Sequence, residues 1–218
     1  MEIVKIYSSE KLLNVFRQKA QLLTLAALNL PCMPIFEDQL FEGITATDIN
    51  LGDYEYCTFK NCNFAKANFS AYNFMECTFE GCDLSGANIH EAGLKTVAFK
   101  NCKLLGVQFE RCNPFLLEMR FEGCQLDLSS FYQLVLKKTL FDNCSMKEVD
   151  FSNSDLSAAR FNNCDLYGAV FERTNLTKAD LSSATNYGIN PEVNTITKAV
   201  FSLPGLPGLL TKYGIKVV

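Results

Sequence analysis

Residues 154–181 read SDLSA-ARFNN-CDLYG-AVFER-TNLTK-ADL, and each quintet opens with a small residue and places a large apolar residue third. The spacing extends further, because every fifth residue from Ile44 to Phe109, and again from Phe121 to Leu181, is Ile, Leu, Phe, Tyr or Met. These fifth-position residues number 14 in the first run and 13 in the second. A period of five fits neither a helix nor a strand, so the sequence predicts a repeat architecture whose unit is the quintet.

The cysteines indicate how many quintets close one turn. Cys62, Cys82 and Cys102 are 20 residues apart, as are Cys124, Cys144 and Cys164, and 20 residues are four quintets. We therefore expect a square coil whose large residues fill the axis and whose small residues, two places earlier, also point inward. Successive coils would pair as parallel strands about 4.8 Å apart, which makes seven to eight coils from residue 36 to residue 185.

The units Ser154-Asp155-Leu156, Cys164-Asp165-Leu166 and Ala179-Asp180-Leu181 resemble those of the pentapeptide-repeat family, over roughly residues 41–185. The resemblance implies an all-β solenoid, namely a right-handed quadrilateral parallel β-helix. We predict an N-terminal helical cap or extension at 1–34, the repeat β-helix at 35–202, and a C-terminal helix and strand at 203–218.

The N-terminal stretch differs from the repeats. Residues 9–30 are rich in leucine, contain no Gly or Pro and follow Ser8, which predicts an amphipathic helix covering the first coil. The basic residues ahead of Leu22 would also suit a signal peptide, but Glu2 and Glu10 disfavour it. No apolar run approaches the length that a membrane-spanning helix needs. A natural start at Met33 is a further alternative.

At the other end the apolar spacing stops at Leu181, makes an excursion over residues 186–195 and returns at Ile196 and Phe201. Residues 203–218 then predict a short helix, a stop at Gly214 and a final strand. This tail resembles that of the Qnr-type quinolone-resistance branch, which protects DNA gyrase and dimerises through this region. The resemblance implies a homodimer, and the alternative is a monomeric cap over the last coil. The residues implied at the dimer contact are Leu206, Leu209, Leu210, Tyr213, Ile215 and Val217.

One register break interrupts the repeats at 110–120, because the step from Phe109 to Phe121 is longer by two than a pair of quintets. The outward positions around it are unusually apolar, and they are either covered by neighbours or form a partner-binding patch. In the Qnr-type branch a projecting loop is needed for gyrase protection, but two extra residues make a far smaller projection. The apolar outward residues are Leu105, Phe115, Leu117, Leu128, Tyr132, Val135 and Leu140. Our candidate partner contacts are Arg111, Asn113, Phe115, Leu117, Glu118, Asp127, Tyr132, Glu148 and Asp165.

Charge and composition disfavour several functions. The net charge is -4, and Asp127, Glu148 and Asp165 share one predicted face with Lys147, so no continuous acidic stripe copies duplex DNA. Mimicry of duplex DNA by the shape of the rod, which the resemblance to the gyrase-protecting branch implies, stays open together with local acidic patches. No basic surface suggests direct binding of nucleic acid. The sequence carries no catalytic motif, and its one histidine, His90, has no predicted partner for chemistry. We therefore expect neither an enzyme nor a cofactor.

Nine of the ten cysteines, all but Cys32, occupy the small inward position, where a thiol acts as a small apolar group. With no Cys-x-x-Cys and a single histidine, the sequence predicts no metal site. Unpaired buried thiols favour a reducing compartment, hence the cytoplasm. Two functions stay open: a topoisomerase-binding protein that shields gyrase from quinolones, and a scaffold that binds an unrelated protein near Phe115.

Overall fold

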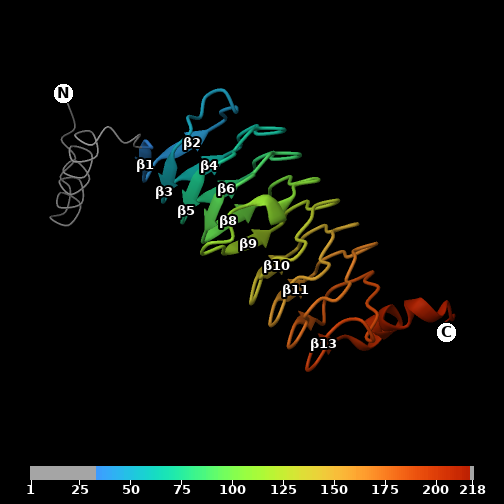
Figure 1. The fold of residues 1–218 in the computed structure, drawn as a ribbon. Coiled ribbons are helices and arrows are strands. Elements are labelled where there is room, and N and C mark those ends of the chain that lie inside the picture. Colours follow the sequence, from blue (N-terminus) through green and yellow to red (C-terminus); the bar gives the residue numbers. More distant parts are fainter. Residues whose placement is uncertain (1–32, 217–218) are drawn as a thin grey trace, which may run out of the picture. The chain divides into compact units, whose positions relative to one another are not determined.

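The structure, a computed structural model, describes residues 33–216, and the helix expected at 9–30 lies outside this range. From Ile35 the chain forms one compact unit, a parallel β-solenoid of about eight turns (Figure 1). Each coil has four sides, which we number in chain order as faces 1 to 4, so that faces 1 and 3 lie on opposite sides. The predicted all-β solenoid is therefore confirmed.

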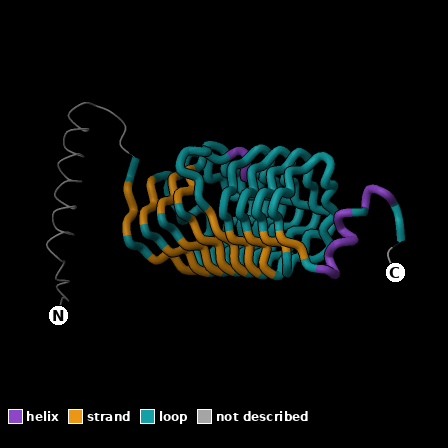
Figure 2. Tube along the Cα trace, turned by 90° about the horizontal axis from the view of Figure 1, so that it is seen from below, coloured by secondary structure: helices purple, strands orange, loops and turns teal. Residues whose placement is uncertain are grey.

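Two of the faces carry regular strands (Figure 2). Face 1 holds a four-stranded sheet and continues through isolated parallel bridges at Asn113, Val135 and later coils. Its strands are β1 (Ile35–Glu37), β3 (Asp53–Glu55), β5 (Asn73–Met75) and β7 (Gly93–Lys95). Face 2 holds a nine-stranded sheet with one strand per coil. Its strands are β2 (Leu40–Glu42), β4 (Thr58–Lys60), β6 (Thr78–Glu80), β8 (Val97–Lys100), β9 (Met119–Glu122), β10 (Leu140–Asp142), β11 (Arg160–Asn162), β12 (Asp180–Leu181) and β13 (Val200–Phe201).

Faces 3 and 4 are held by single bridges between coils, such as Asn63 with Asp83 on face 3 and Asn68 with Asn88 on face 4. Most paired residues are four quintets apart, as predicted from the cysteines; Phe59 pairs with Phe79, for example. Two steps differ. The step from Phe41 to its partner Phe59 is shorter by two, and the step from Phe99 to its partner Phe121 is longer by two, which confirms the register break.

The fifth-position residues fill the axis as predicted. All 27 except Ile44 are buried, and Ile44 packs half-buried against the same core. Phenylalanines form stacked columns along two faces: Phe121 and Phe141 lie 5.3 Å apart on face 2, and Phe131 and Phe151 lie 5.3 Å apart on face 4. Edge-to-face contacts join the two columns, for example Phe141 with Phe151 at 6.0 Å, so the axis has no room for a channel.

The cysteines at the small inward position, nine in the described part of the chain, are buried and free. Each of several thiols donates a weak hydrogen bond to a carbonyl of the preceding coil, as Cys82 Sγ does to Phe59 O at 3.2 Å and Cys102 Sγ to Phe79 O at 3.4 Å. A thiol therefore satisfies a backbone acceptor while filling a space that a larger side chain would overfill. Within residues 33–216, no cluster of three or more His, Cys, Asp or Glu residues could hold a metal ion.

The corners require left-handed backbone. The last residue of most quintets has a positive φ, and between faces 2 and 3 four successive corner positions alternate Asn and Gly: Asn61 (51°), Gly81 (64°), Asn101 (52°) and Gly123 (63°). A Cβ built on Gly81 would lie 2.5 Å from Asn61 Oδ1, because the Asn side chain leans over the next coil. Glycine is therefore favoured there by both backbone conformation and space.

After Leu181 the excursion keeps the axis filled, because Tyr187 and Ile189 are buried. The predicted return is confirmed: Thr195 bridges to Asn175, and β13 pairs with β12. The tail forms two 3-10 helices, η2 (Leu203–Leu209) and η3 (Thr211–Tyr213), and Gly214 in left-handed conformation ends η3. Pro204 and Pro207 lack the N–H that a longer helix would need.

The predicted final strand is wrong as far as the structure shows it. Residues 214–216 have no strand conformation and no pairing partner, and Val217 and Val218 lie outside the described residues. No helix in the described part of the chain is long and apolar enough to cross a membrane.

Candidate protein-binding surface

The register break forms a bulge on face 1. Asn113 still bridges to Gly93, and Met119 pairs with Val97, so the two extra residues lie between them. Asn113 Oδ1 accepts a hydrogen bond from Phe115 N at 2.9 Å, which holds the start of the bulge. Within it Leu117 turns toward the core, where it is half-buried, while Phe115 and Leu116 are each 65% exposed.

Three exposed apolar side chains lie at the bulge or on the next coil of the same face, namely Phe115, Leu116 and Val135. We call them the Phe115 patch. Val135 lies on the next coil of face 1 and is 60% exposed. Lys95 Nζ lies 5.6 Å from the centre of the Phe115 ring, a cation–π contact from the preceding coil. An exposed aromatic ring beside two aliphatic side chains is a typical protein-binding feature.

The other apolar residues expected around the break do not join this patch. Leu105 and Leu128 belong to face 3, Tyr132 to face 4 and Leu140 to face 2, where it is half-buried. The four-sided coil separates residues that are neighbours in the sequence. Leu116 was not among the predicted contacts, and its only signal in the sequence was its place inside the insertion.

The candidate contacts are likewise divided among faces. Asn113, Phe115, Leu117 and Glu118 lie together on face 1 or at its corner, and Arg111 is exposed at the corner where face 4 leads into face 1. Tyr132 is on face 4. Asp127, Glu148 and Asp165 are on face 3, opposite the Phe115 patch, so one flat partner could not touch both groups.

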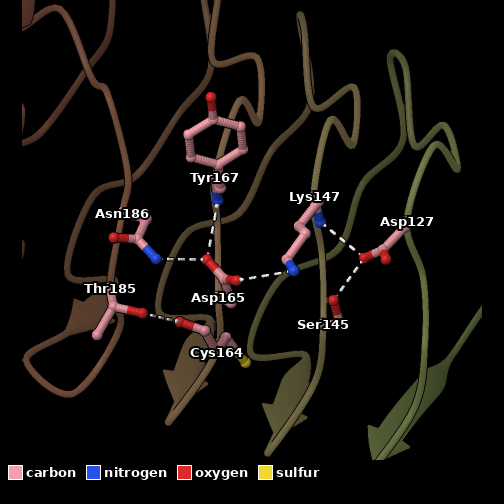
Figure 3. A network of polar contacts seen from close by, with 8 residues as sticks. All are labelled: Asp127, Ser145, Lys147, Cys164, Asp165, Tyr167, Thr185 and Asn186. Carbon is pink, nitrogen blue, oxygen red and sulfur yellow. Dashed lines mark hydrogen bonds and ion pairs between the residues drawn. The ribbon is translucent and has the colours of Figure 1, made fainter.

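Two acidic residues of face 3, Asp127 and Asp165, are held by polar contacts within the chain (Figure 3). Asp127 accepts hydrogen bonds from Ser145 Oγ at 2.6 Å and from Lys147 N at 2.9 Å. Asp165 lies 3.5 Å from Lys147 Nζ and accepts a hydrogen bond from Asn186 Nδ2 at 2.8 Å. The hydrogen bond from Asn186 lowers the pKa of the Asp165 carboxyl below its usual value. These carboxylates therefore stabilise contacts between coils, and Lys147 divides their negative charge.

The C-terminal tail packs on its own last coil. Ile189 N donates to Gly208 O at 2.9 Å, and Gly205 and Gly208 lie against Tyr187 so closely that a Cβ would clash with it. Tyr213 Oη donates to Glu192 Oε1 at 3.3 Å, and Lys212 pairs with the same carboxylate. Among the expected dimer contacts, Leu209 is half-buried against the core and Val217 lies outside the described residues. The exposed ones are Leu206, Leu210, Tyr213 and Ile215.

Stacked quintets with small and large inward residues define a parallel β-solenoid built from five-residue repeats. A family model described as a pentapeptide repeat region matches residues 53–114 and 116–190, which is more than half of the chain. The chain therefore belongs to the pentapeptide-repeat family.

Comparison with solved structures finds QnrB1 and other pentapeptide repeat proteins. A trypsin-treated variant of QnrB1, a plasmid-mediated fluoroquinolone resistance protein, is 19% identical, with 85% of this chain and 100% of that chain covered and a TM-score of 0.45. HetL, a pentapeptide repeat protein involved in heterocyst differentiation regulation in the cyanobacterium Nostoc, is 17% identical to this chain. The match covers 84% of this chain and 92% of HetL, with a TM-score of 0.40. No curated protein matches the chain. Likenesses of this size do not identify a partner.

Proposed function

We propose that this chain is a non-enzymatic protein-binding protein and that the Phe115 patch is its contact surface. The observation that carries the proposal is the bulge on face 1, which exposes Phe115 and Leu116 at 65% each on an otherwise regular wall. In the bulge Pro114 is exposed and Leu117 returns to the core, while Phe115 and Leu116 between them present two large apolar side chains to solvent. Exposing them without a partner would cost solubility and gain nothing in packing.

A binding role also suits the filled axis. Enzyme pockets are concave and hold substrate away from water, whereas the interior of this solenoid is occupied by stacked phenylalanine and leucine side chains. Contacts must therefore be made on the outer faces. The nine free buried thiols support a reducing compartment, and we infer the cytoplasm.

DNA gyrase is the first partner to test, because the tail resembles that of the gyrase-protecting branch. The assay is gyrase supercoiling in the presence of a fluoroquinolone, titrated with the purified protein. Rescue at equimolar protein that is lost in Phe115→Asp would support gyrase binding through the patch. Phe115→Ser, which removes the ring without adding a charge, separates loss of the apolar contact from repulsion.

The same assay tests whether acidic residues imitate DNA. Asp127→Lys, Glu148→Lys and Asp165→Lys together should abolish rescue if face 3 substitutes for duplex DNA, and should leave it unchanged if face 1 makes the contact. No rescue by the folded parent protein would remove gyrase as a partner. The proposed function would then depend on another partner whose binding is lost in Phe115→Asp.

The tail supports a second contact. Leu206, Leu210 and Ile215 are exposed beyond the last coil, which fits the dimer contact implied by the resemblance. Leu206→Asp with Leu210→Asp should halve the mass measured by light scattering if the tail joins two copies, and should leave it unchanged if the tail is only a cap.

A further inference from the structure

One corner of the solenoid carries an ordered series of charges. Along the corner between faces 1 and 2 lies a series of residues that we call the corner row: Tyr56, Glu76, Thr96, Glu118, Lys138, Ala158, Lys178 and Lys198. The bulge puts two residues at this corner: Leu116 has the left-handed conformation of the other members (φ 56°), and Glu118, which hydrogen-bonds to Thr96, is the one counted in the row. Hydrogen bonds between coils fix this register, since Thr96 Oγ1 donates to Glu118 Oε2 and Lys138 N and Lys178 N donate to the next coil. The acidic residues occupy the N-terminal half of the row and the basic residues the C-terminal half. The uncharged members of the row do not break this order.

The rest of face 1 follows this division only in part, because Lys95 of β7 lies beside the acidic residues of the N-terminal end. Asp53 and Glu55 are the charged residues of β3, and burial together with neighbouring Glu37 and Asp53 raises the pKa of Glu55 above its usual value. Beyond the bulge Lys137 Nζ lies 3.3 Å from Asp155, so this pair is neutral as a unit. The Phe115 patch thus lies beside the point of the corner row where the acidic members end and the basic members begin.

We propose that face 1 binds a second copy of this chain, packed antiparallel about a two-fold axis between the coil of Phe115 and the coil of Val135. This names the partner of the Phe115 patch and in that respect rests on the proposed function. The axis places Glu118 opposite Lys138 of the second copy, and Glu76 opposite Lys178. No two like charges of the corner row then face each other, and each contact occurs twice because the interface is isologous.

The apolar centre fits the same axis. Phe115 and Lys137 each lie two residues after a bridged residue of face 1, Asn113 and Val135, on neighbouring coils, so the axis brings each Phe115 ring beside the Lys137 of the other copy. Leu116 and Val135 flank this contact. An aromatic centre surrounded by charged residues is the usual arrangement of a protein interface.

The length of the row suits a stable contact. Seven coil steps separate Tyr56 from Lys198, about 34 Å at about 4.8 Å per step. A standard interface of about 800 Å² per partner is on the order of 30 Å across. The self-complementary segment is therefore long enough for a dimer, although the energy must come mainly from the centre, since exposed charge pairs contribute little each.

The test exploits the charge order with two double variants. Variant A is Glu76→Lys with Glu118→Lys, and variant B is Lys138→Glu with Lys178→Glu. In a dimer of A, lysines would face lysines at both charged pairs of the corner row, 118 with 138 and 76 with 178. In a dimer of B, glutamates would face glutamates at the same pairs. One copy of A and one of B restore every opposite pair. By sedimentation equilibrium we expect each variant alone to dimerise at least tenfold more weakly than the parent, and the equimolar mixture to recover the parent affinity.

The matched control is Glu148→Lys. Glu148 has the same left-handed corner conformation as Glu76 (φ 55° and 53°) and the same charge, but it lies on face 3. It should leave the dimer unchanged. Because the mixture must regain affinity, misfolding of a single variant cannot imitate the expected result.

Three outcomes would overturn the proposal: a parent protein that stays monomeric at all concentrations, a mixture of A and B that remains as weak as either alone, or a dimer that dissociates only in the tail variants Leu206→Asp and Leu210→Asp. A monomeric parent whose gyrase rescue is still lost in Phe115→Asp would leave the proposed function intact without this dimer. If the chain forms a dimer with the expected charge dependence but binds no other protein, the dimer proposal stands and binding of a different protein partner by the patch is refuted.

Discussion

Phe151→Ala should be among the most destabilising single substitutions in the chain. The Phe151 side chain is fully buried, and its ring stacks on Phe131 at 5.3 Å and on Phe171 at 5.2 Å. Its edge meets Phe141 at 6.0 Å and Phe161 at 5.9 Å, so four rings lose a neighbour at once. Truncation of a fully buried phenylalanine costs about 3–5 kcal/mol, and the regular coils on either side leave little freedom to close the cavity. We expect about 4 kcal/mol, which is about 8–16 °C in Tm for a chain of this size.

The assay is denaturant unfolding followed by far-UV circular dichroism, since the chain contains no tryptophan. Phe115→Ala is the matched control, because the same atoms are removed from a ring that is 65% exposed. Its free energy of unfolding should change by no more than about 0.5 kcal/mol. Phe151→Asp should not fold at all, because it would place an unpaired carboxylate on the packed axis. Equal unfolding midpoints for the two alanine variants would refute the inward orientation of the fifth-position residues.

Three further predictions follow from the corners, the thiols and the tail. Gly81→Ala should lower the free energy of unfolding by about 1–2 kcal/mol, because of its positive φ and the nearby Asn61 Oδ1; adding Asn61→Ala should restore the steric part, measured by denaturant midpoints. Burial raises the pKa of the Cys112 thiol to about 12, so the folded state holds the neutral thiol. This thiol should therefore make stability fall as pH rises from about 9 toward 12, where it ionises only in the unfolded chain, and the fall should be smaller in Cys112→Val. Burial also raises the pKa of Cys62, to about 11, so part of the fall remains in the variant. Gly208→Ala should detach the tail, because its Cβ would lie 2.4 Å from Tyr187 O; limited proteolysis should then cut within η2 while the coils stay intact.

The axis of the solenoid could be predicted from sequence because its requirement is local and repeats every five residues. Phe151 and Leu156, for example, face inward for the same reason as every other fifth-position residue, since each quintet turns one corner. The positions of Leu117 and Leu116 could not be predicted in this way. After an insertion of two residues, the five-residue spacing no longer predicts which side chain returns to the core. In the structure it is Leu117 that packs against the core, while Leu116 is exposed.

The predicted final strand is absent from residues 215 and 216, the part of it that the structure describes, for a related reason. The sequence after Gly214 has the β-branched composition of a strand, but a strand in this fold needs a neighbouring coil to pair with. The tail instead follows Gly205 and Gly208 across Tyr187, where the close contact of backbone and ring keeps it on the end of the last coil. The amino-acid composition predicted a preference for strand conformation, but a strand forms only where a neighbouring coil offers backbone groups to pair with.

The charge order of the corner row shows why a surface is harder to predict than a core. Its members are spaced by four quintets in most coils, but the bulge lengthens one step by two, from Thr96 to Glu118. A count of four quintets from Thr96 reaches Leu116, which has the left-handed corner conformation (φ 56°), whereas the side chain that hydrogen-bonds to Thr96 is that of Glu118. The division between Glu118 and Lys138 then disappears, because Leu116 would stand where the last acidic residue belongs. Outward residues interact only with the coils directly above and below them, so their pattern can be recognised only after the register of every coil is known. That the insertion both exposes Phe115 and shifts the register suggests one use for it: it sets the apolar centre of face 1 at the point where the charge changes sign.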